Sequence, residues 1–212
     1  MGTMLVVGSA PCLFEDVKRA LHIRPFASLM LVNGACTAFE NAEHMLCGHE
    51  EKAEFFVRER KRVFPNAPPI RVHACCHPHR KGMMAGMFPS VTDWHNHEIG
   101  VGATSASKAA KLAFLLGATE VILCGCPMNQ EGYFEGEAKV PQHVMCNRIG
   151  SFGNAHGLFK SNGQPLPVQE TRIIKGYRAN LKILAEGEFK GRVFSMSGFT
   201  RDCLGAPPEG LF

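Results

Sequence analysis

The chain has 212 residues, of which 45% are hydrophobic and 20% charged, and it carries a formal net charge of +4. This composition is that of a folded globular protein, and it excludes an intrinsically disordered chain, a collagen-like rod and a coiled coil. The length suits one α/β domain with a full-sized core. The mild positive charge suits an anionic small molecule such as a nucleotide, but it falls short of the strongly basic character typical of nucleic-acid-binding proteins.

Neither a membrane span nor a disulfide framework is indicated. No apolar run approaches the roughly 20 residues that a bilayer-spanning helix needs. The first apolar stretch, Met4–Val7, is too short for the core of a signal peptide. The nine cysteines are scattered, and Cys124 lies within an apolar run, where a free thiol behaves as a small buried hydrophobe. We therefore expect a cytoplasmic protein with reduced thiols.

Short β-type runs alternate with longer helical patterns along the chain, which is typical of a parallel sheet with crossover helices. Most of these runs are continuously apolar, as expected for strands covered on both faces. In chain order the candidate strands are Met4–Val7, Ser28–Val32, Glu43–Cys47, Pro69–Ala74, Glu120–Cys124 and Arg192–Ser195. The sequence therefore predicts a single Rossmann-like α/β domain over residues 1–212, with a mostly parallel sheet of about six strands and helices on both faces.

Three helices have apolar residues at helical spacing. Glu50–Phe64 and Thr171–Ala185 each carry one apolar stripe, whereas Ser105–Leu116 is apolar almost all round and is expected to be buried. Two long stretches interrupt the alternation of strands and helices. Residues 76–100 are rich in His, Met and Gly, and residues 126–168 are rich in Gly, Asn, Gln and Pro. We expect both to be irregular loops that meet over one cleft.

Three strand–helix junctions are candidate nucleotide-binding elements. Small residues at Gly8, Ser9 and Ala10 follow the first strand, where backbone amides can approach a phosphate or ribose. Asn33 follows the second strand and could read a base or ribose through its amide. A tight turn that binds nothing, and a plain Asn-Gly turn, are the alternatives at these two places.

The third junction opens the buried helix with Gly102, Thr104 and Ser105. Thr104 or Ser105 could serve as N-cap, and the amides of that first turn could bind an anion. A cap without any ligand is the alternative.

These junctions together carry a family resemblance. Residues 8–13, Gly-Ser-Ala-Pro-Cys-Leu, resemble a motif of the Rossmann-like bacterial sialyltransferases of the lipooligosaccharide type and of their relatives around the archaeal hydroxymethylpterin diphosphokinase. Residues 109–127 resemble that group's alanine-rich helix followed by Leu-Gly-x-x-Glu-Ile-x-Leu-x-Gly-x-Asp, and residues 128–134 resemble its loop. The resemblance implies that Asn33 contacts a nucleotide and that Asn129 and Tyr133 lie in a loop that closes over it.

Departures from that pattern bear on the chemistry. The family aspartate falls at Pro127, which removes a carboxylate that could hold a metal and weighs against a diphosphokinase. The sialyltransferases carry a catalytic histidine in the loop before their last long helix, and His143 and His156 lie in the comparable loop here, although neither matches the motif closely. Of the two, His156 is the preferred general base.

A second group of residues joins His73, Cys75, Cys76, His77 and His79 to a later cluster around His95 and His97. Such residues could build a tetrahedral zinc site, but their spacing matches no known zinc motif. A histidine-rich loop that binds an anionic ligand, or plain surface histidines, are the other interpretations. We expect a mobile wall of the cleft without a structural metal.

The function predicted from these observations is a nucleotide-dependent transferase, most simply a glycosyltransferase-like enzyme with a nucleotide-sugar donor as co-substrate. It would need no essential metal and no tightly bound cofactor. Gly8, Ser9 and Ala10 would hold donor phosphate or ribose. The alternatives are a non-catalytic nucleotide sensor on the same fold and a transferase that modifies nucleotides or nucleic acid. The acceptor is not identified by the sequence, and an oligomer is compatible with it.

Overall fold

The computed structural model describes residues 2–48, 50–75, 81–95, 99, 104–128 and 172–209. In chain order its elements are β1 (Thr3–Val7), α1 (Leu13–Ile23), β2 (Ser28–Val32), the 3-10 helix η1 (Asn33–Thr37), β3 (His44–Cys47), η2 (Glu50–Lys52), α2 (Ala53–Val63), β4 (Arg71–Cys75), α3 (Lys81–Met87), β5 (Asp93–His95), α4 (Ser105–Leu115), β6 (Glu120–Cys124), α6 (Arg172–Glu186), β7 (Val193–Ser195) and α7 (Gly198–Leu204).

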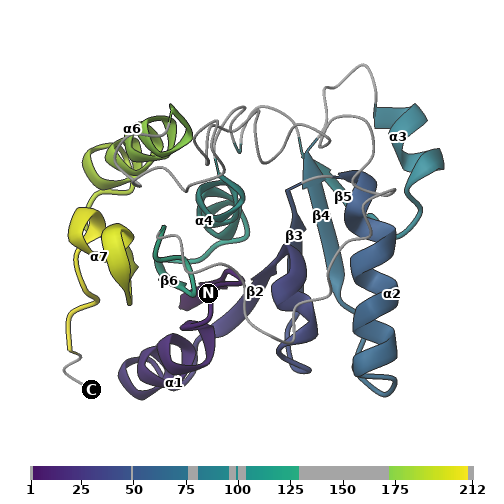
Figure 1. The fold of residues 1–212 in the computed structure, drawn as a ribbon, viewed down its shortest axis with the longest axis horizontal. Coiled ribbons are helices and arrows are strands. Elements are labelled where there is room, and N and C mark those ends of the chain that lie inside the picture. Colours follow the sequence, from purple (N-terminus) through teal and green to yellow (C-terminus); the bar gives the residue numbers. More distant parts are fainter. Residues whose placement is uncertain are drawn as a thin grey trace, which may run out of the picture.

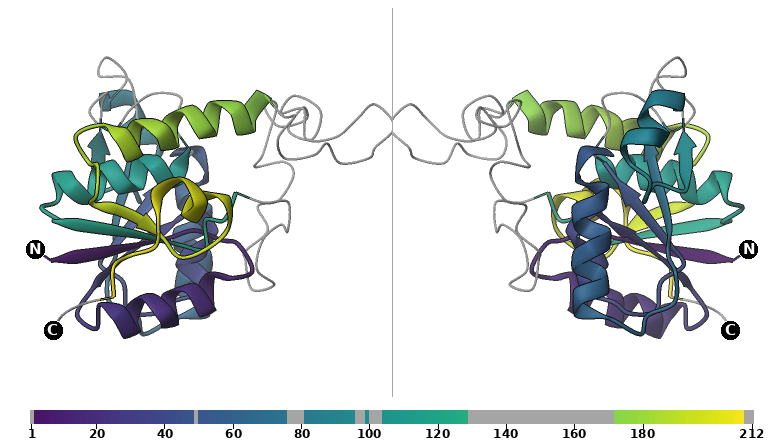
Figure 2. Two further views of the ribbon diagram at one scale, coloured as in Figure 1. Left: turned by 90° about the vertical axis from the view of Figure 1, so that its left-hand side faces the viewer. Right: turned by 90° about the vertical axis from the view of Figure 1, so that its right-hand side faces the viewer.

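The strands form one parallel sheet of seven in the order β5-β4-β3-β2-β1-β6-β7. Helices α1 and α2 cover one face of the sheet, and α4 and α6 cover the other (Figures 1 and 2). The predicted α/β fold is therefore confirmed. It is a doubly wound sheet, in which each connection between parallel neighbours crosses over one face.

Side chains that alternate between the two faces of the central strands form the two layers of the hydrophobic core. In β1, Leu5 and Val7 belong to the core shared with α1 and α2, whereas Met4 and Val6 belong to the core shared with α4 and α6. All four side chains are at most 1% exposed. Because successive side chains of a strand point to opposite faces, an apolar residue at every position seals both layers.

The sheet has one strand more than predicted, and the extra strand lies in a stretch expected to be irregular. β5 is only three residues long, Asp-Trp-His, and lies at the edge of the sheet, where its residues are half-buried. A short polar edge strand has no apolar run by which sequence could reveal it. The same stretch contains α3, whose seven residues include two glycines, so the prediction of an irregular loop over 76–100 is wrong for both segments.

Two histidines of the 73–97 group, which was expected to form a mobile wall of the cleft, are strand residues, and one of them falls within the predicted strand Pro69–Ala74. His73 lies in β4 and is fully buried, and His95 is the last residue of β5. His77, His79 and His97 lie outside the described residues, as does most of the predicted loop 126–168. Among the described helices, none is long and apolar enough to cross a membrane.

Candidate functional site

The topology indicates a ligand site in the crevice at the carboxyl ends of β1 and β6. From β1 the chain winds outward through β2, β3, β4 and β5, and it then returns to the other side of β1 as β6. The connections leaving β1 and β6 therefore run to opposite faces of the sheet and open a gap between them. Open α/β sheets bind their ligands at such a switch point.

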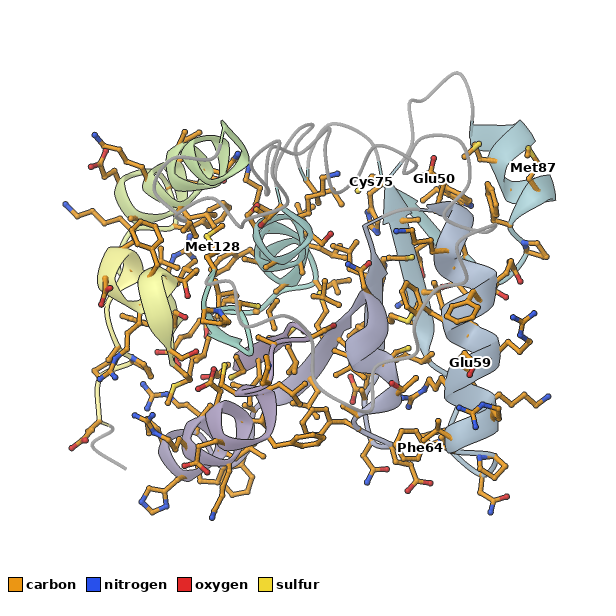
Figure 3. All side chains as sticks on the ribbon, viewed as in Figure 1. Glu50, Glu59, Phe64, Cys75, Met87 and Met128 are labelled. Atoms are coloured by element: carbon orange, nitrogen blue, oxygen red, sulfur yellow. The ribbon has the colours of Figure 1, made fainter. Side chains whose placement is uncertain are left out.

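A pocket of about 200 Å³ occupies this crevice. Its walls come from the β1–α1 turn, the first turn of α4, the residues after β6, and single residues of α6 and α7. The lining residues are Gly8, Ser9, Ala10, Thr104, Ala106, Ser107, Leu123, Gly125, Cys126, Pro127, Met128, Leu181 and Thr200. In Figure 3, Met128 marks this region beside α4.

The floor of the pocket depends on two glycines that let two backbone turns touch. The Gly8 amide donates to the Cys124 carbonyl at 2.8 Å, and the Ala10 amide donates to the Gly125 carbonyl at 3.1 Å. A Cβ on Gly8 would lie 2.6 Å from the Gly125 carbonyl oxygen, and a Cβ on Gly125 would lie 2.7 Å from that of Gly8. Gly125 also has a φ of +61°, a conformation that side chains disfavour. Only glycine fits at these two positions.

The wall opposite is the N-terminus of α4, which Thr104 caps. Thr104 has an extended backbone, and its Oγ1 accepts from the Ser107 amide at 2.9 Å and donates to the Ser107 hydroxyl at 3.0 Å. With the third amide of the helix used by the cap, the amides of Ser105 and Ala106 remain for an outside acceptor. The helix dipole adds positive potential at this end.

No described residue in the lining carries a charge. Any attraction for an anion there must therefore come from backbone amides, hydroxyls and the α4 dipole. Thr104, Ser107, Ser9 and Thr200 supply the hydroxyls, which in the absence of a ligand donate within the protein and would have to turn toward one, whereas the first amides of α4 already face outward. Donors of this kind bind a phosphate ester or a ribose without a fixed positive side chain.

Next to the pocket, Asn33 and Ser105 form a second cluster. Asn33 has a φ of 52°, and its Oδ1 accepts from the Gly48 amide at 2.8 Å, which ties the end of β2 to the end of β3. A side chain at Gly48 would collide with that of Ser105. Since Asn33 Oδ1 accepts from the Gly48 amide, the donors that Asn33 offers to a ligand are those of its side-chain NH₂ group.

A buried carboxylate supports the pocket from below. Asp16 of α1 is 2% exposed, and its Oδ2 accepts from the Gly125 amide at 2.9 Å and from the Ser197 hydroxyl at 2.6 Å. Asp16 thereby joins α1, the residues after β6 and the start of α7. It holds the Gly125 turn in the position that closes the floor.

The nearby cysteines are protonated thiols at neutral pH. Burial raises the pKa of Cys126 to about 12, and it also raises the pKa of Cys124. The pKa of Cys12 is raised too, mainly by burial and further by the Asp16 charge. A thiol nucleophile or thiolate ligand needs the opposite shift, so these residues fill space and do not supply chemistry.

The structure brings Gly8, Ser9, Ala10 and Thr104 together in one pocket, as a shared binding role requires. Asn33 and Ser105 lie together in the neighbouring cluster. Gly102, Asn129, Tyr133, His143 and His156 lie outside the described residues. Among the described residues no group of three or more His, Cys, Asp or Glu side chains is arranged to hold a metal ion.

Sequence reasoning missed Asp16, Thr200 and Leu181. Asp16 could have been found, because it falls on the buried face of α1 with Leu13, Val17 and Ala20. An acidic residue is seldom buried unless its carboxylate has hydrogen-bond partners. Thr200 and Leu181 carry no such signal. They reach the pocket only because α7 folds back onto the residues after β6, where Thr200 donates to the Cys126 carbonyl, and because α6 packs against α4.

Comparisons with known structures agree with this architecture. No protein-family model matches the sequence, and no curated protein gives a significant match. The fold, however, is similar to that of the sialyltransferase CstII from Campylobacter jejuni. In complex with the substrate analogue CMP-3FNeuAc, that structure superposes with a TM-score of 0.63 at 12% identity, over 100% of this chain and 90% of the other. In complex with cytidine-5'-monophosphate the TM-score is 0.59, at 13% identity, over 100% and 88%. At this identity the likeness establishes the fold.

Proposed function

We propose that this protein is a glycosyltransferase-like enzyme that uses a nucleotide-sugar donor. The observation that carries the proposal is the pocket at the switch point, where the Gly8–Ala10 turn faces the capped start of α4. The structures with similar folds were solved with CMP or a CMP-sugar analogue, which supports a nucleotide as the ligand.

In this proposal the Gly8–Ala10 turn and the first turn of α4 hold the donor phosphate and ribose. Because the Gly8 and Ala10 amides donate to the Cys124 and Gly125 carbonyls, the donors are the Ser9 amide and the first amides of α4. Preorganised amides also stabilise the negative charge that develops on the leaving phosphate as the glycosidic bond breaks. Asn33 would contribute a donor to the nucleotide from the neighbouring cluster. Tyr133 and Asn129 would close over it, and His156, or else His143, would take the proton of the acceptor hydroxyl.

The reaction is proposed to need no metal. A metal-dependent transferase holds a divalent cation with carboxylates near the donor phosphates. Pro127 lines the pocket where the resemblance would place an aspartate. Full activity in the presence of a chelator supports this part of the proposal, and activity restored only by added Mg²⁺ or Mn²⁺ contradicts it.

The binding part is tested by filling the pocket. Ala106 lines it and lies in the first turn of α4, so Ala106→Leu narrows the pocket while keeping a strong helix former. Calorimetric titration with CMP, UDP and GDP should show one preferred nucleotide whose affinity falls at least about tenfold in this variant, or about 1.4 kcal/mol. Ala85→Leu makes the same change at an exposed position of α3 and should leave affinity unchanged.

Turnover is tested separately with the nucleotide-sugar of the preferred base. Release of free nucleotide, accelerated by an acceptor, identifies a transferase. Tight binding without hydrolysis or transfer of any donor would instead identify a nucleotide sensor. Binding to DNA or RNA that weakens steeply with salt would identify the nucleic-acid alternative.

A further inference from the structure

Three histidines form a continuous chain across three neighbouring strands, away from the pocket. His44 Nδ1 lies 3.0 Å from His73 Nε2, and His73 Nδ1 lies 3.0 Å from His95 Nε2. Both distances are those of hydrogen bonds between ring nitrogens. The central ring therefore uses both of its nitrogens within the chain.

The strand register places the three histidines on a diagonal line across the strands. His44 is the first residue of β3, His73 is paired with Leu46 farther along that strand, and His95 is the last residue of β5, paired with Cys75. Each step therefore moves one strand sideways and two residues toward the carboxyl edge. Strands β3, β4 and β5 lie side by side in Figure 1, and Cys75 marks the carboxyl edge in Figure 3.

The two ends reach different surfaces. His95 is half-buried at the carboxyl edge, the edge that also carries the pocket. At the amino edge, His44 Nε2 lies 3.9 Å from a carboxylate oxygen of Glu43, whose side chain is 73% exposed. Between these ends His73 has no exposed surface.

Fixed charges around the chain favour one direction of hydrogen bonding. Glu43 attracts a proton on His44 Nε2, which makes His44 Nδ1 the acceptor for His73. Asp93 lies 3.9 Å from His73 Nδ1, but Arg71 donates to its carboxylate at 2.7 and 3.2 Å and Thr92 donates at 2.8 Å. Glu43 therefore favours a proton on Nε2 of all three rings.

We propose that His44, His73 and His95 form a proton relay from the carboxyl edge of the sheet to solvent at the amino edge. A proton binds His95 Nδ1, and His95 Nε2 passes its proton to His73 Nδ1. His73 Nε2 then passes its proton to His44 Nδ1, and His44 Nε2 releases one to the Glu43 carboxylate or to water. Three N–H bonds form and three break, so one proton crosses and no electron is transferred.

The environment of the His73 ring favours passing a proton on over holding it. Burial lowers the pKa of His73 to about 4, and it also lowers that of His44. A ring that stays neutral passes a proton only by exchanging one N–H for the other. The use of this relay to remove the proton released by an acceptor hydroxyl rests on the function proposed above.

The relay is tested by nitrogen-15 NMR of the histidine rings in the full chain without ligand. At neutral pH all three rings should be protonated on Nε2. In His44→Phe, His73 loses its acceptor, so the His95 ring should change to a mixture of tautomers. Exchange of the His73 ring proton with solvent should then slow by about tenfold or more, since a buried proton otherwise leaves only through local opening.

His22→Phe, at an exposed position of α1, is the matched control and should change neither measurement. Rings of unlike tautomer in the unaltered protein, or an unchanged His95 ring in a folded His44→Phe variant, overturn the proposal. If His44→Phe does not fold, Glu43→Gln replaces it and should shift the rings toward protonation on Nδ1; no shift overturns the proposal. The measurement needs neither donor nor turnover, so it can fail or succeed independently of the proposed transferase activity.

Discussion

The pocket side and the histidine side of this sheet are built by opposite means. Around β1 and β6, small residues let backbones approach each other, and the described lining carries no charge. Across β3, β4 and β5, three imidazoles are hydrogen-bonded in a row, and the charged side chains of Glu43, Arg71 and Asp93 lie beside them. Fixed amides can hold a bound anion without any change of protonation, whereas proton movement needs rings that can exchange one N–H proton for another. The two halves therefore respond to different perturbations.

The largest effect is expected where the backbones touch. Gly125→Ala combines a positive φ with a Cβ 2.6 Å from that of Leu13, and it should lower the free energy of unfolding by about 3 kcal/mol. Gly191→Ala is the matched control, because its φ is +69° but nothing lies within 4 Å, and it should cost about 1 kcal/mol. Urea unfolding measures both. Equal losses would show that contact across the pocket floor adds nothing.

On the histidine side the main effect should be on the pH dependence of stability. Because burial lowers the pKa of His73 from 6.5 to about 4, the unfolded chain binds more protons than the folded chain between these values. Stability from this residue is therefore complete above pH 6.5 and declines as the pH falls, by about 2 kcal/mol at pH 5. Unfolding curves of His73→Gln should have a shallower slope between pH 6.5 and 5, whereas His22→Gln should keep it. A slope unchanged by His73→Gln would contradict the assignment.

A smaller effect should follow from weakening the support of the pocket. Asp16→Asn keeps the shape of the side chain but removes the charge that accepts from Gly125 and Ser197, and it should cost about 1.5 kcal/mol. Asp202→Asn, at an exposed position of α7, should cost almost nothing. Thermal unfolding measures the stability, and nucleotide titration shows whether the floor also loses affinity. Equal losses of stability in the two variants would contradict a supporting role for Asp16.

The smallest effect on stability, and the sharpest on binding, is expected at the cap of α4. Thr104→Ala removes the acceptor of the Ser107 amide and should cost about 1 kcal/mol. Thr104→Ser retains the hydroxyl and should restore both stability and nucleotide affinity. If both variants bind nucleotide as the unaltered protein does, the start of α4 is not part of the ligand site.

Local patterns were enough to predict the elements that are long and apolar. The Ser28–Val32 and Glu120–Cys124 strands were predicted with the bounds that the structure gives them, and Ser105–Leu116 differs from α4 by one residue. In such segments the hydrophobic period itself determines which element buries the side chains. With three residues, β5 carries too few side chains to express a period, and the two glycines of α3 argue against a helix, so both elements were missed.

The sequence by itself determined that this chain forms a parallel α/β sheet, because apolar runs and helical stripes are properties of neighbouring residues. Only the tertiary structure decided which polar groups meet. Asp16 and Ser197 are 181 positions apart, and the histidine pairs are separated by 29 and 22 positions. Those contacts depend on strand order and register, which are set by the packing of the whole sheet, and no local pattern contains that information.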